Sequence, residues 1–165
     1  METTLQHITL QNFKLKSGKI LDINLSYQIF WPELFSAPVI LVNHALTGNS
    51  NVAGTKGWWN DLIGAQKIID TEQFTVLCFN ILGNGFDGNT IENYQDFITS
   101  DVARIFLEGL NYLKIEKLHT IIGGLLGGGI GWEMLAVNPE LTENFIPVAC
   151  DYQTSDWLYS QCLVQ

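Results

Sequence analysis

The stretch HTIIGGLLGGGIGWEM, residues 119–134, predicts a buried strand that turns abruptly into a helix. Its apolar start indicates the strand, and the helical pattern is expected to open near Gly128. Gly123 and Gly127 lie two positions on either side of Leu125, which is the G-x-nucleophile-x-G spacing of a nucleophile elbow. Glycines there avoid the Cβ clashes of a sharp strand-to-helix reversal. The turn therefore has the form of an elbow with an aliphatic tip, and simple close packing of strand and helix is the alternative.

The remaining strand patterns predict an α/β fold. Short, nearly continuous apolar runs are typical of parallel strands covered on both faces. Two segments instead alternate apolar with polar residues around Ser17-Gly18, which favours an antiparallel hairpin with one solvent-facing side. The apolar runs are residues 38–45, 74–82, 118–124 and 144–150, and the alternating segments are residues 5–13 and 20–30.

Two helices are expected between the parallel strands. Residues 98–115 place apolar side chains on one face at helical spacing, with Ser100 as the expected N-cap. Residues 129–141 supply the second helix. No repeat, linker or low-complexity tract interrupts the 165 residues, so a single domain over residues 1–165 is predicted.

The composition argues against several classes of function. The formal net charge of -9, from 17 acidic and 8 basic residues, disfavours nucleic acid or an anionic membrane as a partner. The N-terminal residues lack a signal-peptide pattern, and no apolar run is long enough to cross a bilayer, so a cytoplasmic protein is expected. Cys78, Cys150 and Cys162 lie in apolar contexts without CxxC spacing and are predicted to be reduced structural residues. No metal or cofactor site is predicted, because no cluster has ligand spacing.

Two further loops follow predicted strands at the edge of the sheet where α/β proteins bind ligands. Residues 43–54, NHALTGNSNVAG, are small and polar, so their backbone amides could bind an oxyanion. An exposed connection without function is the alternative. Residues 83–88, GNGFDG, match GxGxxG, but helical periodicity resumes only near Ile98. A tight turn is therefore predicted there, in preference to a dinucleotide site.

Taken together, these loops resemble one family, the homoserine O-acetyltransferases and their relatives within the α/β-hydrolase superfamily. The order and spacing of six motifs match over nearly the whole chain, and the first two are specific to that family. The motifs are NHALTG (43–48), KGWWNDLIG (56–64), IDT (69–71), FNILGN (79–84), DVAR (101–104) and GGLLGG (123–128).

The resemblance implies an acyl transfer by double displacement, in which an elbow serine takes an acetyl group from acetyl-CoA and passes it to the hydroxyl of homoserine. Acetyl-CoA is the co-substrate, and no further cofactor or metal is implied. Leu125 occupies the nucleophile's position, and the backbone amides of Leu46 and Leu126 match the oxyanion hole. The elbow glycines are Gly123, Gly127 and Gly128.

Two departures from the family predict that this chain is inactive. Leucine has no lone pair with which to attack a thioester. The superfamily's triad runs from nucleophile to Asp or Glu to His along the chain, but after Leu125 only Asp151 and Asp156 follow as aspartates, and no histidine does. His7, His44 and His119 are interpreted as structural, His44 by shaping the 43–54 loop through hydrogen bonds. The alternatives are a hydrolase of the same fold and a non-catalytic binding module.

The last residues are expected to leave the sheet incomplete relative to the family. Residues 151–165 are interpreted as the start of the family's helical lid, and the C-terminal strands and the rest of the lid are missing. The strand in 144–150 then becomes an exposed edge, although its composition suits an interior strand. Because such edges recruit partner strands, self-association is predicted.

Overall fold

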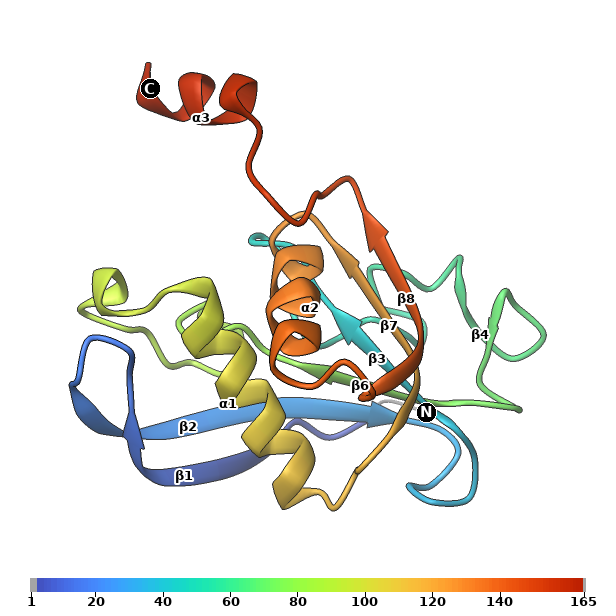
Figure 1. Cartoon of the computed structure of the whole chain (residues 1–165). Coiled ribbons are helices and arrows are strands. Elements are labelled where there is room, and N and C mark those ends of the chain that lie inside the picture. The colour runs from blue at the N-terminus through green and yellow to red at the C-terminus, as the bar shows by residue number, and fades with distance from the viewer. Residues whose placement is uncertain (1–2, 165) are drawn as a thin grey trace.

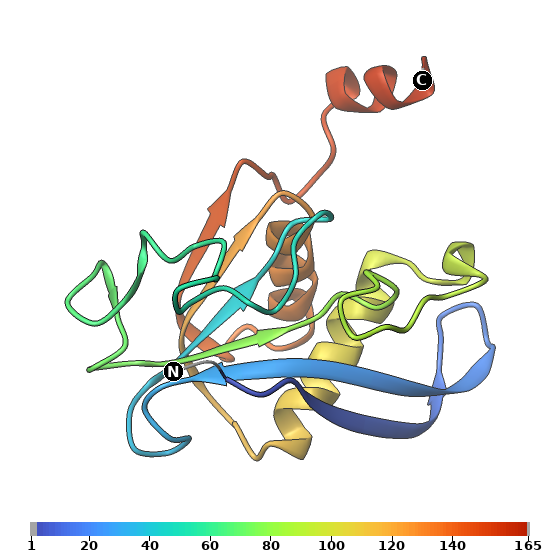
Figure 2. The same ribbon diagram turned by 180° about the vertical axis from the view of Figure 1, so that it is seen from behind.

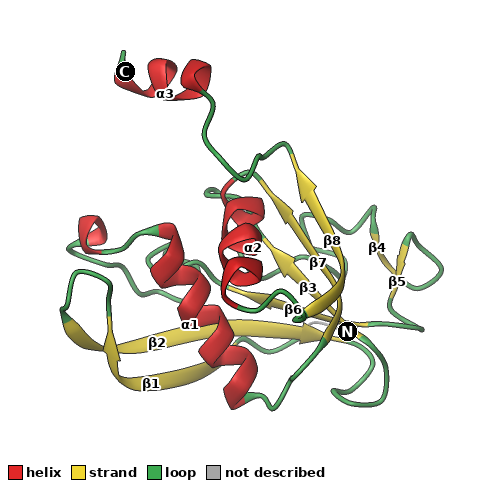
Figure 3. Ribbon diagram, viewed as in Figure 1, coloured by secondary structure: helices red, strands yellow, loops and turns green. Residues whose placement is uncertain are grey.

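The computed structural model describes residues 3–164 and shows one main sheet with helices packed against it (Figures 1 and 3). The strand order is β1-β2-β6-β3-β7-β8. Strands β6, β3, β7 and β8 run parallel, whereas β2 is antiparallel to both β1 and β6. The predicted α/β class, a parallel sheet extended by an N-terminal hairpin, is confirmed. The strands are β1 (Gln6–Lys14), β2 (Ile20–Phe30), β3 (Val39–Asn43), β6 (Thr75–Phe79), β7 (Leu118–Gly124) and β8 (Thr142–Val148).

Helix α1 (Thr99–Tyr112) and helix α2 (Leu126–Val137) lie on the same face of the sheet (Figure 1). The predicted N-cap is wrong, because Ser100 is buried inside the first turn of α1. Asp101 does the capping instead: its carboxylate accepts hydrogen bonds from the N–H of Ile98 at 3.3 Å and of Lys16 at 2.8 Å. A carboxylate at this end of a helix is also favoured by the helix dipole.

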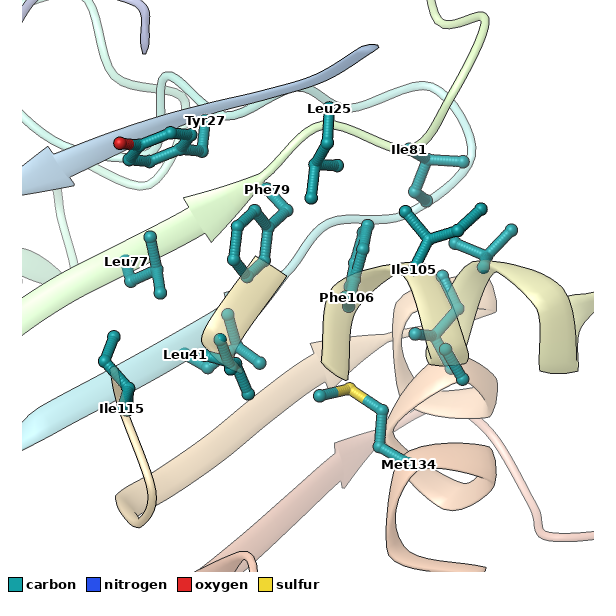
Figure 4. Packing of buried hydrophobic residues seen from close by; sticks show 14 of the residues in the cluster. Leu25, Tyr27, Leu41, Leu77, Phe79, Ile81, Ile105, Phe106, Ile115 and Met134 are labelled. Carbon is teal, nitrogen blue, oxygen red and sulfur yellow. The ribbon is translucent and has the colours of Figure 1, made fainter. Parts of the chain in front are cut away.

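The main core fills the space between the sheet and these two helices (Figure 4). Phe79 of β6 and Phe106 of α1 stack with ring centroids 5.1 Å apart. Gly109 lets α1 approach the sheet closely, since a Cβ atom there would lie 2.7 Å from Leu25. The alternating face of the hairpin contributes to the same core, which explains why an antiparallel pair with one wet side joins a parallel sheet.

The opposite face of the sheet is covered by a long loop, not by a helix (Figure 2). Residues 44–74 cross this face and include a separate two-stranded sheet, β4 (Ile63–Gly64) with β5 (Ile69–Asp70). Val52 and Ile63 from this loop belong to the same buried apolar cluster as Ile40 and Val42 of β3. The apolar runs thus predicted correctly that β3 and β6 are covered on both faces, with irregular backbone as the second cover. For β8 the prediction is wrong, because this strand lies at the edge and Ile146 and Val148 are exposed.

The GNGFDG segment forms turns, as predicted. Gly83, Gly85 and Gly88 all have positive φ values, a conformation that side chains rarely adopt. The next helical residues are the short 3-10 helix η1 (Tyr94–Asp96) and then α1. The segment therefore does not open a helix, which a pyrophosphate site requires.

Strand β8 forms one edge of the sheet, and β7 is its only partner strand within residues 3–164. Ile146 and Val148 are 47% and 43% exposed there, so the predicted exposed edge is confirmed. Beyond it, helix α3 (Asp156–Leu163) projects away from the sheet (Figures 1 and 2) with Trp157 and Leu158 exposed. A helix in this region agrees with the sequence, while its interpretation as a lid stays a prediction.

The cysteines differ in how deeply they are buried. Cys78 is buried in β6, as predicted, whereas Cys150 is only partly buried. The side chain of Cys162 lies outside the described part of the chain. No helix in residues 3–164 combines the length and the apolarity needed to cross a membrane.

Candidate active site

The turn between β7 and α2 has the geometry of a nucleophile elbow. Leu125 is its tip, with φ 50° and ψ -118°, a conformation that strains any residue with a Cβ atom. Its N–H donates to the carbonyl of Val148 at 3.0 Å, and its own carbonyl accepts from Gly129 at 3.1 Å. The helix begins at Leu126, two residues earlier than predicted, because the backbone reverses entirely at Leu125. The leucine side chain is 58% exposed.

The three elbow glycines are required by close approach and not by their own φ values. A Cβ atom at Gly123 would lie 2.5 Å from the carbonyl oxygen of Gly127. One at Gly127 would lie 2.6 Å from the carbonyl oxygen of His44 and would overlap that of Asn43. One at Gly128 would overlap the Sγ atom of Cys150. The first turn of α2 is thus wedged between the ends of β7, β3 and β8.

This wedge brings the two predicted oxyanion-hole residues to the same edge of the sheet. Leu126 is the first residue of α2, so its N–H has no acceptor within the helix. Leu46 lies in the loop after β3 and is 70% exposed, and its N–H makes no hydrogen bond to any residue in 3–164. Unpaired amides beside an elbow can stabilise a negatively charged oxygen. Both residues lie at the carboxyl edge of the sheet, where β3 and β7 end.

The loop that carries Leu46 is anchored by His44, which is 1% exposed. Its Nδ1 lies 2.7 Å from the carbonyl oxygen of Ala45, and its Nε2 accepts the N–H of Ile81 at 3.0 Å. Burial lowers the pKa of the imidazole, and the Ala45 carbonyl opposes that shift. The interpretation of His44 as a residue that shapes the loop agrees with these contacts.

A buried polar network anchors the other end of the loop, and sequence reasoning missed it. Asn80 accepts the N–H of Ser50 at 2.7 Å and donates to the hydroxyl of Ser26 at 2.9 Å. The Ser50 hydroxyl in turn donates to Gln28 at 2.8 Å. The signal was a polar residue directly after the last residue of β6, but the other members of the network lie in two distant segments, β2 and the 44–74 loop. Low local dielectric makes a satisfied network of this kind rigid.

None of the other imidazoles lies beside the elbow. His119 is near the start of β7 with its ring 4.9 Å from that of Phe74, and six extended residues put it about 20 Å from Leu125. His7 is on β1, where it pairs with Ser26. Both positions agree with the structural reading of these residues.

The acidic residues Asp151 and Asp156 and the Cys150 thiol also lack the setting of catalytic groups. Asp151 and Asp156 are exposed. Burial, followed by the charge of Asp151, raises the pKa of the Cys150 thiol, which keeps it protonated and poorly nucleophilic. Within residues 3–164, no three His, Cys, Asp or Glu side chains are grouped closely enough to hold a metal ion.

Comparison with known families agrees with this geometry. A family model described as the alpha/beta hydrolase fold matches residues 38–156, from the start of β3 to the start of α3. The chain belongs to the α/β-hydrolase family. The strained tip residue, the glycines around it and the parallel strand order are those of a member of this family.

Within the α/β-hydrolases, the chain is similar to homoserine O-acetyltransferases. It is 30% identical to the enzyme of Corynebacterium diphtheriae over 93% of this chain and 44% of that protein. It is 34% identical to the enzyme of Methanococcus vannielii over 86% of this chain and 33% of that protein. The crystal structure of homoserine O-acetyltransferase from Bacillus anthracis superimposes with a TM-score of 0.84 at 26% identity, covering 94% of this chain and 49% of that one. The chain thus spans a third to a half of these relatives.

Proposed function

We propose that this chain provides the elbow and oxyanion half of an acyl-transfer site of the homoserine O-acetyltransferase type. We also propose that, with leucine at the elbow, the chain forms no acyl-enzyme. The single observation that carries the proposal is the conformation of Leu125, since a strained tip between a buried strand and a helix is built to present a reactive group. The similarity to homoserine O-acetyltransferases supports acetyl-CoA as the acyl donor and homoserine as the acceptor.

The oxyanion part of the site is independent of the missing nucleophile. The amides of Leu46 and Leu126 belong to the backbone, so they keep their positions when the side chain at Leu125 changes. A thioester carbonyl that accepts hydrogen bonds from both amides would have its carbon next to the Leu125 side chain. Binding of the acetyl group is therefore compatible with this chain, whereas covalent transfer is not, because no lone pair is available for attack.

Restoring the hydroxyl alone is not expected to restore the reaction. An elbow serine needs a base within hydrogen-bond reach. Both nitrogens of His44 are engaged by Ala45 and Ile81, and the other two imidazoles lie on distant parts of the sheet. A serine at position 125 would stay a weak nucleophile at neutral pH.

A non-catalytic binding module is the second candidate, and the exposed apolar tip favours it. Leu125 and Leu46 are both more than half exposed at the same edge of the sheet. An apolar tip beside two free amides suits a ligand with a carbonyl next to an alkyl group. Such a site would bind that ligand without reacting with it.

Intact-mass analysis after incubation with acetyl-CoA tests the proposal. Neither the natural chain nor the Leu125→Ser variant should gain an acetyl group, with Leu125→Ala as the control for access to the amides. An acetylated Leu125→Ser protein would show that a base acts on the elbow and would overturn the reasoning. Shifts of the Leu46 and Leu126 amide resonances with acetyl-CoA would support acyl binding, and unchanged resonances would refute it.

A further inference from the structure

His44 bridges two loops that are far apart in the sequence. His44 directly follows β3, and its imidazole accepts a hydrogen bond from the N–H of Ile81, which lies just after β6. Gly48 folds back against the ring, since a Cβ atom there would lie 3.2 Å from both Cγ and Nδ1. The imidazole therefore forms the link between the segment 44–48, which contains Leu46, and the end of β6.

The two partners of the ring specify one tautomer. A backbone carbonyl can only accept a hydrogen bond, so the nitrogen facing Ala45, Nδ1, carries the hydrogen. A backbone N–H can only donate, so the nitrogen facing Ile81, Nε2, must be unprotonated. A second proton on Nε2 would point at the N–H of Ile81. The bridge therefore accommodates the neutral imidazole and excludes the imidazolium.

We propose that His44 is a positioning residue whose neutral imidazole holds the 44–48 segment in place, and that protonation of the imidazole releases this segment. The link would act in this way whether or not the site transfers acyl groups. The remaining anchors, from Asn84 to Gly48 at 3.3 Å and from Ser50 to Asn80, lie beyond Thr47. Release would thus free Leu46 while the rest of the loop stays attached.

Among the residues that the structure describes, no neighbouring charge compensates an imidazolium at this position. Gly48 from the loop, Ile81 from the end of β6 and Gly127 from α2 have no ionisable side chains. A titratable neighbour in the described part of the chain is Cys78 of β6, whose thiol interacts with the His44 backbone. Burial raises the pKa of that thiol, so it stays uncharged in acid. The lowered pKa of His44 agrees with this setting.

Nuclear magnetic resonance on the natural chain tests both parts of the proposal. At neutral pH, the His44 imidazole should show the hydrogen on Nδ1. As the pH is lowered from about 6.5 to the pKa of His44 in the folded chain, protection of the Ile81 amide from hydrogen exchange should fall about tenfold for each pH unit. The reason is that the released segment binds one more proton, on His44, than the closed segment does. The Leu46 amide resonance should shift over the same pH range in which the His44 imidazole becomes protonated.

A matched pair of variants separates this bridge from general acid sensitivity. In His44→Gln the side-chain amide can donate to Ala45 and accept from Ile81 without titrating, so the acid-dependent loss of protection should vanish. In His7→Gln, which changes an exposed histidine on β1, it should persist. A hydrogen on Nε2, or the same acid response in His44→Gln as in the natural chain, would overturn the proposal. Neither result depends on acetyl-CoA, so the proposed function is tested separately.

Discussion

Replacing Leu125 by glycine and by alanine measures the strain that the elbow retains. The φ value of 50° with ψ -118° disfavours every residue with a Cβ atom, including leucine and alanine. Glycine adopts such values freely. The comparison between the two variants therefore isolates the backbone conformation, because both remove the leucine side chain.

The expected difference between the two variants follows from two contributions. Strain of this kind costs about 1–3 kcal/mol in a residue with a Cβ atom. Glycine recovers that cost but loses about 0.5–1 kcal/mol to the greater freedom of the unfolded chain. The glycine variant should thus be more stable than the alanine variant by about 1 kcal/mol. Because Leu125 is 58% exposed, truncation to alanine should itself cost about 1 kcal/mol of lost burial.

Urea unfolding monitored by far-UV circular dichroism measures these free energies. With a slope of about 2 kcal/mol/M for a domain of this size, the two midpoints should differ by about 0.5 M. Gly124→Ala is the matched control, because no atom lies within 4 Å of a Cβ there and its φ is ordinary. At Gly124 alanine should equal or exceed glycine. If alanine exceeded glycine at position 125 by about 0.5–1 kcal/mol, which is the advantage expected where the backbone is unstrained, the elbow would store no strain and the reasoning would fail.

Four further outcomes are expected. Gly127→Ala should lower stability by several kcal/mol or prevent folding, because its Cβ would overlap the backbone at the end of β3. Gly124→Ala should not have this effect, and the urea midpoints of the two variants measure the difference. Gly128→Ala should be destabilising, and Cys150→Ala should relieve part of that loss in a double-mutant cycle, since the overlap is with the Cys150 sulfur. Hydrogen bonds from the N–H groups of Glu72 and Gln66 lower the Asp70 pKa. The stabilisation they reflect is present above the unfolded pKa of about 3.9 and is lost as pH falls through the folded value, so Asp70→Asn should destabilise at neutral pH and be nearly neutral in strong acid. The free edge of β8 should make the chain self-associate; sedimentation as a monomer at all concentrations would contradict this.

The strand and helix content could be predicted from the sequence because it depends on local patterns. Apolar runs marked the parallel strands, alternation marked the β1–β2 hairpin, and helical spacing marked α1. The glycine spacing around Leu125 also located the elbow. Helix boundaries could not be predicted as well: α1 begins at Thr99 with Ile98 as its N-cap residue, so Ser100 lies inside the first turn and Asp101 accepts the N–H of Ile98.

The site could be predicted only in part, because its contacts join distant segments. The bond between His44 and Ile81 spans 37 residues, and that between Asn80 and Ser26 spans 54. No local pattern specifies such partners. Glycine is likewise required at position 127 because a Cβ atom there would overlap the backbone of Asn43, which lies on another strand.

The amino-acid sequence was therefore sufficient for the class of fold, the position of the elbow and the aliphatic residue at its tip, since each is a property of neighbouring residues. Tertiary packing was needed to show that a loop covers the second face of the sheet, that Leu46 and Leu126 lie at one edge of it, and that His44 links Ala45 to Ile81. These features depend on which groups become neighbours after burial, where desolvation and close contact set the energies.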